Sequence, residues 1–123
     1  MNQDDIEKFL KLQPKLKIIH TEMSLLSKKS PNEPLNKFKL KFINNLIETA
    51  NEILGEYKPF EDFEVFSDDD LPTNSDVVFI ISPYLRSLEK LRCDNISEDS
   101  MYHWYWMIDG VQTSMATDGA TIR

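Results

Sequence analysis

The densest group of chemically active side chains is an acidic segment in the middle of the chain. Its six carboxylates belong to Glu61, Asp62, Glu64, Asp68, Asp69 and Asp70. Carboxylate oxygens can bind divalent cations, but a calcium loop needs a glycine at its sixth position and a glutamate at its twelfth. Counted from Asp68, those positions hold Thr73 and Phe79. The spacing therefore favours a solvated or partner-facing acidic loop over a metal site.

The residues that could act as a nucleophile or a general base are scattered. His20 and His103 lie far apart in the chain, and neither has a second ligand residue at the spacing of a zinc site. Cys93 follows an apolar helical stripe, which favours a helix-end position over a nucleophile. With only three glycines, the chain is poorly suited to form a glycine-rich loop that binds phosphate. It also lacks the G-x-S-x-G sequence that surrounds a common type of serine nucleophile. The sequence therefore predicts no catalytic residue, no metal and no cofactor.

The segment around residues 102–106 is aromatic on both faces of an expected strand. Tyr102, Trp104 and Trp106 alternate with His103 and Tyr105, which is the two-residue period of a strand. A strand with one face on the core can bury only one of these sets. Tyrosine and tryptophan are frequent anchors of protein interfaces. Core packing and partner contact both remain open for the face formed by Tyr102, Trp104 and Trp106.

The charge of the chain is unevenly distributed. The net charge is −7, which disfavours general binding to nucleic acid. Residues 1–60 carry ten basic and eight acidic side chains, whereas residues 61–123 carry four basic and thirteen acidic ones. A negative field of this kind speeds the association of a basic partner. The competing interpretation is that the charge only confers solubility.

The elements that position these residues begin with helices. Apolar residues at helical spacing predict a helix over residues 3–12, with Asn2 as its N-cap. Pro14 interrupts this pattern and is expected to open a second helix, because proline is tolerated at a first helical position. The clearest pattern is a third helix over residues 35–54, which Gly55 ends.

The middle of the chain combines a loop with an ambiguous segment. Residues 57–74 lack any period and are expected to form an ordered loop. Three phenylalanines are expected to hold it to the body of the protein: Phe60, Phe63 and Phe66. Over residues 76–92 an apolar stripe continues in phase across Pro83, which favours one kinked helix. The alternative is a strand over the β-prone run 77–81, followed by a helix that opens at Pro83.

Strands are expected at the C-terminus. Asp109 and Gly110 form a strong two-residue hairpin signal. A tight turn there would place Trp106 opposite Thr113 and Trp104 opposite Met115. The pair Asp118-Gly119 could close a second hairpin onto a short final strand.

Length and composition complete the fold prediction. A chain of 123 residues with 41% apolar residues predicts a single domain over residues 1–123. One cysteine and no long apolar run predict a cytoplasmic protein without a membrane span. The expected class is α+β: an N-terminal group of about four helices packed on a C-terminal antiparallel β-hairpin or three-stranded meander.

Part of the C-terminal half resembles a known family. The resemblance lies in residues 71–78, LPTNSDVV, in residues 84–92, YLRSLEKLR, and in residues 105–110, YWMIDG. These segments are similar to a family of small uncharacterised bacterial proteins. The resemblance implies a bacterial origin and one continuous helix before the hairpin, and it supplies no activity.

These observations favour a non-enzymatic, acidic binding protein over an enzyme. In its most specific form the hypothesis is an immunity or inhibitor protein that neutralises a basic toxin such as a nuclease. The six carboxylates would meet the basic partner, and the face of Tyr102, Trp104 and Trp106 would supply the apolar contact.

Three alternatives remain open. An enzyme built from scattered residues predicts a deep pocket that contains His20 or His103 beside several acids. A homo-oligomer predicts that the aromatic strand pairs with its own copy. A nucleic-acid binder would use the lysines at one end of the third helix, which are Lys37, Lys39 and Lys41.

Overall fold

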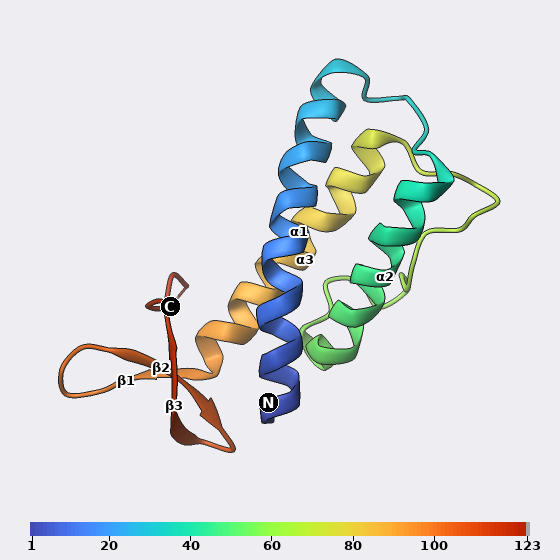
Figure 1. The fold of residues 1–123 in the computed structure, drawn as a ribbon. Helices are drawn as coiled ribbons and strands as arrows, with labels where there is room; N and C mark the ends of the chain where they lie inside the picture. Colours follow the sequence, from blue (N-terminus) through green and yellow to red (C-terminus); the bar gives the residue numbers. More distant parts are fainter. Residues whose placement is uncertain (123) are drawn as a thin grey trace.

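The computed structural model describes residues 1–122, which form three α-helices followed by a three-stranded sheet (Figure 1). The helices are α1 (Gln3–Lys29), α2 (Lys37–Leu54) and α3 (Asn74–Asp94), and a short 3-10 turn, η1 (Gly55–Tyr57), follows α2. The strands are β1 (Ile96–Glu98), β2 (Trp104–Ile108) and β3 (Val111–Thr117). The predicted α+β class is therefore confirmed, with three helices in place of about four.

The difference in helix number arises at Pro14, which lies inside α1 and does not open a new helix. A proline inside a helix costs about 3 kcal/mol, because it removes one hydrogen bond and crowds the preceding turn. The apolar stripe on both sides of the proline outweighs this cost. Its buried members are Ile6, Phe9, Leu12, Leu16 and Met23. Each contributes about 1.5–3 kcal/mol by burial, and a break at Pro14 would turn half of the stripe away from the core.

The helix ends follow the local signals in the sequence. The Asn2 side chain accepts a hydrogen bond from the Asp5 N–H at 2.8 Å and begins α1. Gly55 caps the C-terminus of α2 with a φ of 53°, in the left-handed region that glycine adopts easily. Thr73 and Asp76 form a reciprocal capping box at the start of α3.

Helix α3 continues through Pro83 as one element, so the alternative of a strand followed by a helix is wrong. Its buried face includes Val77, Ile81, Tyr84, Leu88 and Leu91, which keep the helical period on both sides of the proline. The β-prone residues around Ile81 therefore enter a helix, because that period buries them and the capping box fixes the start.

The sheet is an antiparallel meander in the order β1-β2-β3. Asp109 and Gly110 have φ angles of 51° and 78°, as expected for the predicted two-residue turn between β2 and β3. The third strand differs from the expectation. Within residues 1–122 no strand follows Asp118-Gly119. The third strand is instead β1, Ile96–Glu98, which pairs with the edge of β2 opposite β3.

The register of the hairpin also differs from the expectation. Trp104 pairs with Thr117, and the expected pairing of Trp104 with Met115 is wrong. A bulge opposite Trp106 is the reason, because it absorbs two extra residues of β3. The Thr113 hydroxyl stabilises the bulge: it donates to the Trp106 carbonyl at 2.7 Å and accepts from the Met115 N–H at 3.1 Å.

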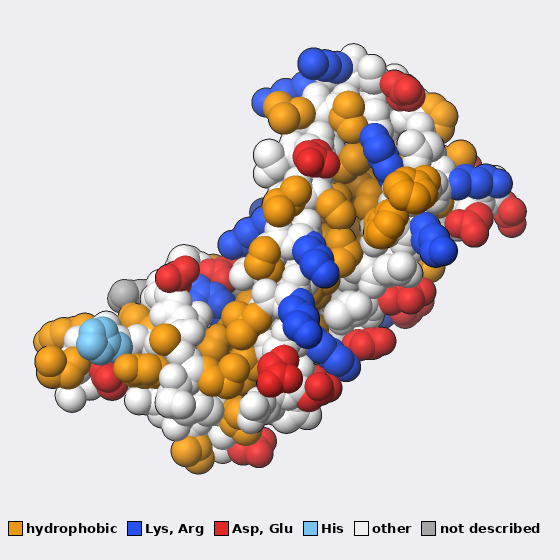
Figure 2. Space-filling model, in the orientation of Figure 1, with side chains coloured by type: hydrophobic (Ala, Val, Ile, Leu, Met, Phe, Trp, Pro, Cys, Tyr) orange, Lys and Arg blue, Asp and Glu red, His pale blue; other side chains and the backbone are white. Residues whose placement is uncertain are grey.

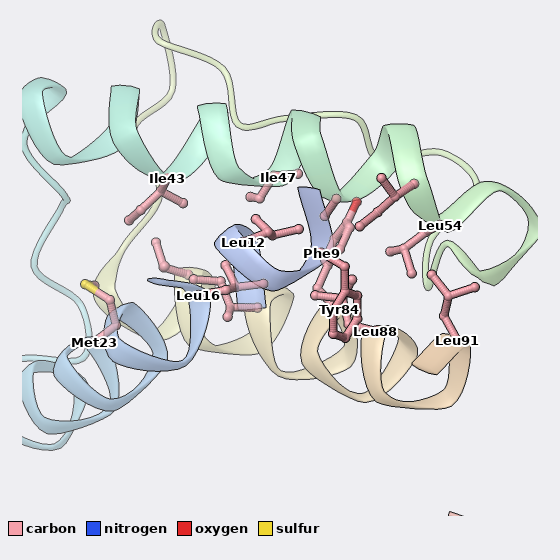
Figure 3. Close-up of a cluster of buried hydrophobic side chains, with 14 of the residues drawn as sticks. Phe9, Leu12, Leu16, Met23, Ile43, Ile47, Leu54, Tyr84, Leu88 and Leu91 are labelled. Carbon is pink, nitrogen blue, oxygen red and sulfur yellow. The ribbon is translucent and has the colours of Figure 1, made fainter. Parts of the chain in front are cut away.

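One cluster of buried side chains joins the three helices to the sheet. Figure 3 shows the part of this cluster that lies between the helices. Phe9 of α1 meets Trp106 of β2 edge to face at a centroid distance of 5.1 Å. This contact places the sheet beside the N-terminal half of α1 and the C-terminal end of α3 (Figure 1). None of the helices within residues 1–122 combines the length and the apolar character that crossing a membrane requires.

Candidate protein-binding surface

The acidic loop between η1 and α3 is exposed at all six of its predicted carboxylates. These are Glu61, Asp62, Glu64, Asp68, Asp69 and Asp70. Glu64 binds the Lys58 ammonium at 2.7 Å, and the other five form no ion pair with any residue from 1 to 122. The loop therefore keeps most of its negative charge available to solvent.

Two asparagines of α2 hold the backbone of this loop. The Asn44 side chain donates to the Phe66 carbonyl at 2.9 Å and accepts from the Phe66 N–H at 3.0 Å. The Asn51 amide donates to the Glu64 carbonyl at 2.9 Å, and its oxygen accepts from the Tyr84 hydroxyl at 2.6 Å. Burial is the main reason that the pKa of Tyr84 is raised above its usual value. The backbone beside the carboxylates is thus fixed in place before any partner arrives.

Aromatic packing gives the loop a second attachment. Phe63 lies edge to face with Phe66 at 5.1 Å, and both Phe60 and Phe63 lie 6.5 Å from the Tyr84 ring. The rings of Phe60, Phe63 and Phe66 are partly buried against the core. The phenylalanines therefore hold the loop to the body of the protein, as the sequence predicted.

A shallow hollow of about 290 Å³ lies where the loop meets the start of α3. Its lining includes Phe66, Asp70, Asp76 and Phe79. Phe79 is 69% exposed and stacks on Phe60 at 6.3 Å. An aromatic face beside two carboxylates suits a lysine or arginine side chain, which can lie over the ring and bind the acids at its head.

Sequence reasoning missed Phe79 and Asp76 as members of this surface. A signal was present, because Phe79 lies outside the buried stripe that contains Val77, Ile81 and Tyr84. A large aromatic residue on the solvent side of an amphipathic helix is a candidate contact residue.

The three residues of the expected aromatic face occupy different environments. Trp106 is fully buried in the core, Trp104 is half-buried, and Tyr102 is 80% exposed in the loop before β2. The bulge and the contact with Phe9 turn Trp106 inward. Figure 1 also shows the sheet and the loop before α3 on opposite sides of the helices, so the structure does not bring the aromatic strand and the acidic loop together.

The candidate catalytic residues do not converge either. His20 Nε2 lies 2.7 Å from the Ser82 hydroxyl, but that hydroxyl donates to the Val78 carbonyl at 2.9 Å. Ser82 thus accepts from the histidine, which is the reverse of a nucleophile activated by a base. His103 is exposed on the β1–β2 loop, 3.9 Å from Asp99. Across residues 1–122, no three His, Cys, Asp or Glu side chains lie close enough together to hold a metal ion.

A cavity of about 350 Å³ between α1, α3 and β3 contains a buried arginine, Arg92. Glu89 binds Arg92 with both carboxylate oxygens, at 2.7 and 2.8 Å, which lowers the pKa of Glu89. The remaining Arg92 N–H groups donate to the Thr117 hydroxyl and to the carbonyls of Asp118 and Gly119. Because every donor is used within the chain, this arginine ties β3 to α3 and leaves no free donor for an anionic ligand.

Comparison with known proteins adds no assignment. No family model matches the chain, and neither the curated proteins nor the solved structures give a significant match. The resemblance of the C-terminal half to small bacterial proteins therefore stays a prediction.

Proposed function

We propose that this chain is a non-enzymatic binding protein that receives a basic protein on its acidic loop. One observation carries the proposal: five exposed carboxylates of the loop have no ion-pair partner in residues 1–122, and one of them, Asp70, lines a hollow together with the exposed ring of Phe79. In this proposal Phe79 supplies the apolar contact expected of the aromatic strand.

The physical advantage of such a loop lies in the rate of association. Several like charges on one exposed segment produce a potential that draws an oppositely charged partner inward. Close contact then places a lysine or arginine in the hollow formed by Asp70, Asp76 and Phe79. Because the loop is already held by Asn44 and Asn51, little ordering entropy is lost on binding.

The most specific form of the proposal is an immunity or inhibitor protein that neutralises a basic toxin such as a nuclease. A nuclease presents lysines and arginines that bind phosphate, and a row of carboxylates can take the place of phosphates at such a site. The chain's own acidic loop supports this form by its charge and its exposure.

The test compares two variants with equal numbers of neutralised acids. The loop variant carries E61Q, D62N, E64Q, D68N, D69N and D70N. The control carries six exposed substitutions elsewhere: E7Q, E48Q, E56Q, E98Q, D109N and D118N. Tagged wild type and both variants are used to capture proteins from the lysate of the source cell at about 0.15 M salt, where the screening length is about 8 Å.

We expect the wild type and the control to capture the same basic protein, and the loop variant to lose it. Isothermal titration with that purified protein should then give a 1:1 complex whose affinity falls with salt. Equal capture by the loop variant would contradict the proposal. Capture of only acidic or neutral proteins by all three forms would contradict it as well.

A further inference from the structure

A second surface, distinct from the acidic loop, lies between α1 and α2. A groove of about 520 Å³ is lined by Ile18 and Ile19 of α1 and by Phe42 and Leu46 of α2. A smaller hollow of about 120 Å³ with Met23 and Leu26 in its lining adjoins it. Figure 2 shows hydrophobic side chains gathered in the hollow between these two helices.

The apolar residues of this groove are exposed well beyond what packing within the chain needs. Ile18 is 60% exposed and Phe42 53%. Phe38, one turn before Phe42, is 73% exposed and meets it edge to face at 5.1 Å. A contiguous apolar patch of this kind on a soluble protein marks an interaction site.

The charges around the groove are mainly positive. Lys15 lines the groove and Lys39 lines the adjoining hollow, where Glu22 is the single acid. Figure 2 shows lysine or arginine side chains on both sides of the hydrophobic strip. At the end of the groove nearer the N-terminus, Lys8 of α1 joins the two helices through an ion pair with Glu52 of α2, and it also pairs with Asp4 of its own helix. A complementary occupant therefore has an apolar ridge with acidic flanks.

We infer that this groove is the docking site for an amphipathic helix of another protein, with acidic residues flanking its apolar face. Two packed helices with an open apolar seam accept the side-chain ridge of a third helix. From Lys15 to Leu26 the groove follows α1 for about 16 Å, which is roughly three turns of a docked helix. Such a helix would present apolar anchors at positions i, i+3 or i+4, and i+7.

Two other occupants fit the groove less well. In a two-fold dimer the same patch meets itself, so the lysines around one groove would face those of the other copy. An anionic membrane attracts lysines, but a bilayer binds a helix that presents its apolar face outward. Here the apolar residues line a concave seam between two helices. The groove and its charges therefore favour a helical protein segment.

The test uses two designed helical peptides of about 18 residues, long enough to span the groove. Both carry leucines at the anchor positions, and the flanking residues are glutamate in one and lysine in the other. Binding is measured by titration calorimetry, and the site is mapped by the shifts of backbone amide signals. We expect the glutamate peptide to bind at least about tenfold more tightly and to shift the amides of Ile18, Ile19 and Phe42.

Variants then separate the apolar contribution from the charged one. F42A and the double variant K15E/K39E should each weaken binding of the glutamate peptide by about tenfold. All three substituted residues line the groove or its adjoining hollow. The matched controls are F79A, an exposed aromatic residue beside the acidic loop, and K37E/K41E, lysines of α2 outside the groove lining. These controls should leave binding within about twofold of the wild type, and circular dichroism checks that every variant is folded.

Several outcomes would overturn the inference. One is a failure of the glutamate peptide to bind, and another is equal binding of the two peptides. A dimer in sedimentation that F42A dissolves would assign the groove to a second copy. Binding to anionic vesicles through the same amides, in the absence of peptide binding, would assign it to a membrane surface. None of these outcomes bears on the acidic loop, which is tested separately.

Discussion

The hydrogen bonds of Asn44 give a direct test of how the acidic loop is held. In N44A the Phe66 backbone loses two partly buried partners, at 2.9 and 3.0 Å. At about 0.5–1.5 kcal/mol for each bond, the loss should destabilise the protein by about 1–3 kcal/mol. Alanine also has the higher helix propensity, by a few tenths of a kcal/mol, which offsets part of this loss.

The matched control is N45A, because Asn45 is an exposed residue of the same helix. Its side chain forms no hydrogen bond with any residue from 1 to 122. The gain in helix propensity cancels when the two variants are compared. For a domain of this size, each 1 kcal/mol corresponds to about 3–6 °C in Tm. We therefore expect N44A to melt at least about 3 °C below N45A, and urea unfolding to give the same order of stability.

Hydrogen exchange locates the effect within the chain. The Phe66 amide should exchange much faster in N44A, because its hydrogen-bond acceptor is removed. Amides in the middle of α3 should lose protection from exchange only to the extent that the whole protein is destabilised. Equal melting temperatures for N44A and N45A, together with unchanged exchange at Phe66, would refute the view that these bonds hold the loop.

Three further predictions concern the framework of the fold. Hydrogen bonds from Arg92 hold the pKa of Glu89 below its ordinary value of 4.5. The ionised carboxylate therefore stabilises the protein fully above pH 4.5, and this stabilisation is lost as the pH falls from 4.5 through the lowered pKa. E89Q should therefore lower Tm at neutral pH, and its difference from the wild type should shrink as the pH falls below 4.5; a constant difference would contradict this. P14A should raise stability by about 1–2 kcal/mol in urea unfolding, because Pro14 is exposed and lies inside α1, whereas a break at that position would make the substitution neutral or unfavourable. W106A should lower the free energy of unfolding by about 3–5 kcal/mol, whereas Y102A should change it by no more than about 0.5 kcal/mol. Similar changes for the two variants would contradict the burial of Trp106.

Local signals in the sequence were sufficient for much of the fold. Asn2, Thr73 and Gly55 act at the helix ends as their types predict, and the Asp109-Gly110 turn forms where its residue types favour it. These features depend on neighbours within a few residues. Because of this local origin, these features can be predicted from the sequence without knowledge of the tertiary contacts.

The parts that differed from expectation depend on contacts between distant residues. Pro14 is a local helix breaker, and only the core formed with α2 and α3 keeps α1 continuous through it. Ile96–Glu98 has no strong strand pattern and becomes a strand because β2 offers it an edge. The bulge opposite Trp106 is likewise determined by tertiary packing, and it changes the register.

The acidic loop was recognisable from its composition, but its architecture was not. Asn44 lies 22 residues before Phe66, so no local pattern connects the two. The contact of Phe79 with Phe60 also joins residues that are far apart in the chain. The sequence thus indicated which side chains carry the charge. The structure is needed to find the hollow beside the loop and to show that the loop and the sheet lie on opposite sides of the helices.

The most direct test of the proposed role is the association rate constant of the captured basic partner, measured by stopped-flow mixing at two salt concentrations. We expect association with the wild type to slow steeply between about 0.05 and 0.5 M salt. The variant with six loop amides should associate slowly at both concentrations, with little dependence on salt. If wild type and variant associate at the same rate with the same salt dependence, the loop does not attract the partner and the proposed function is wrong.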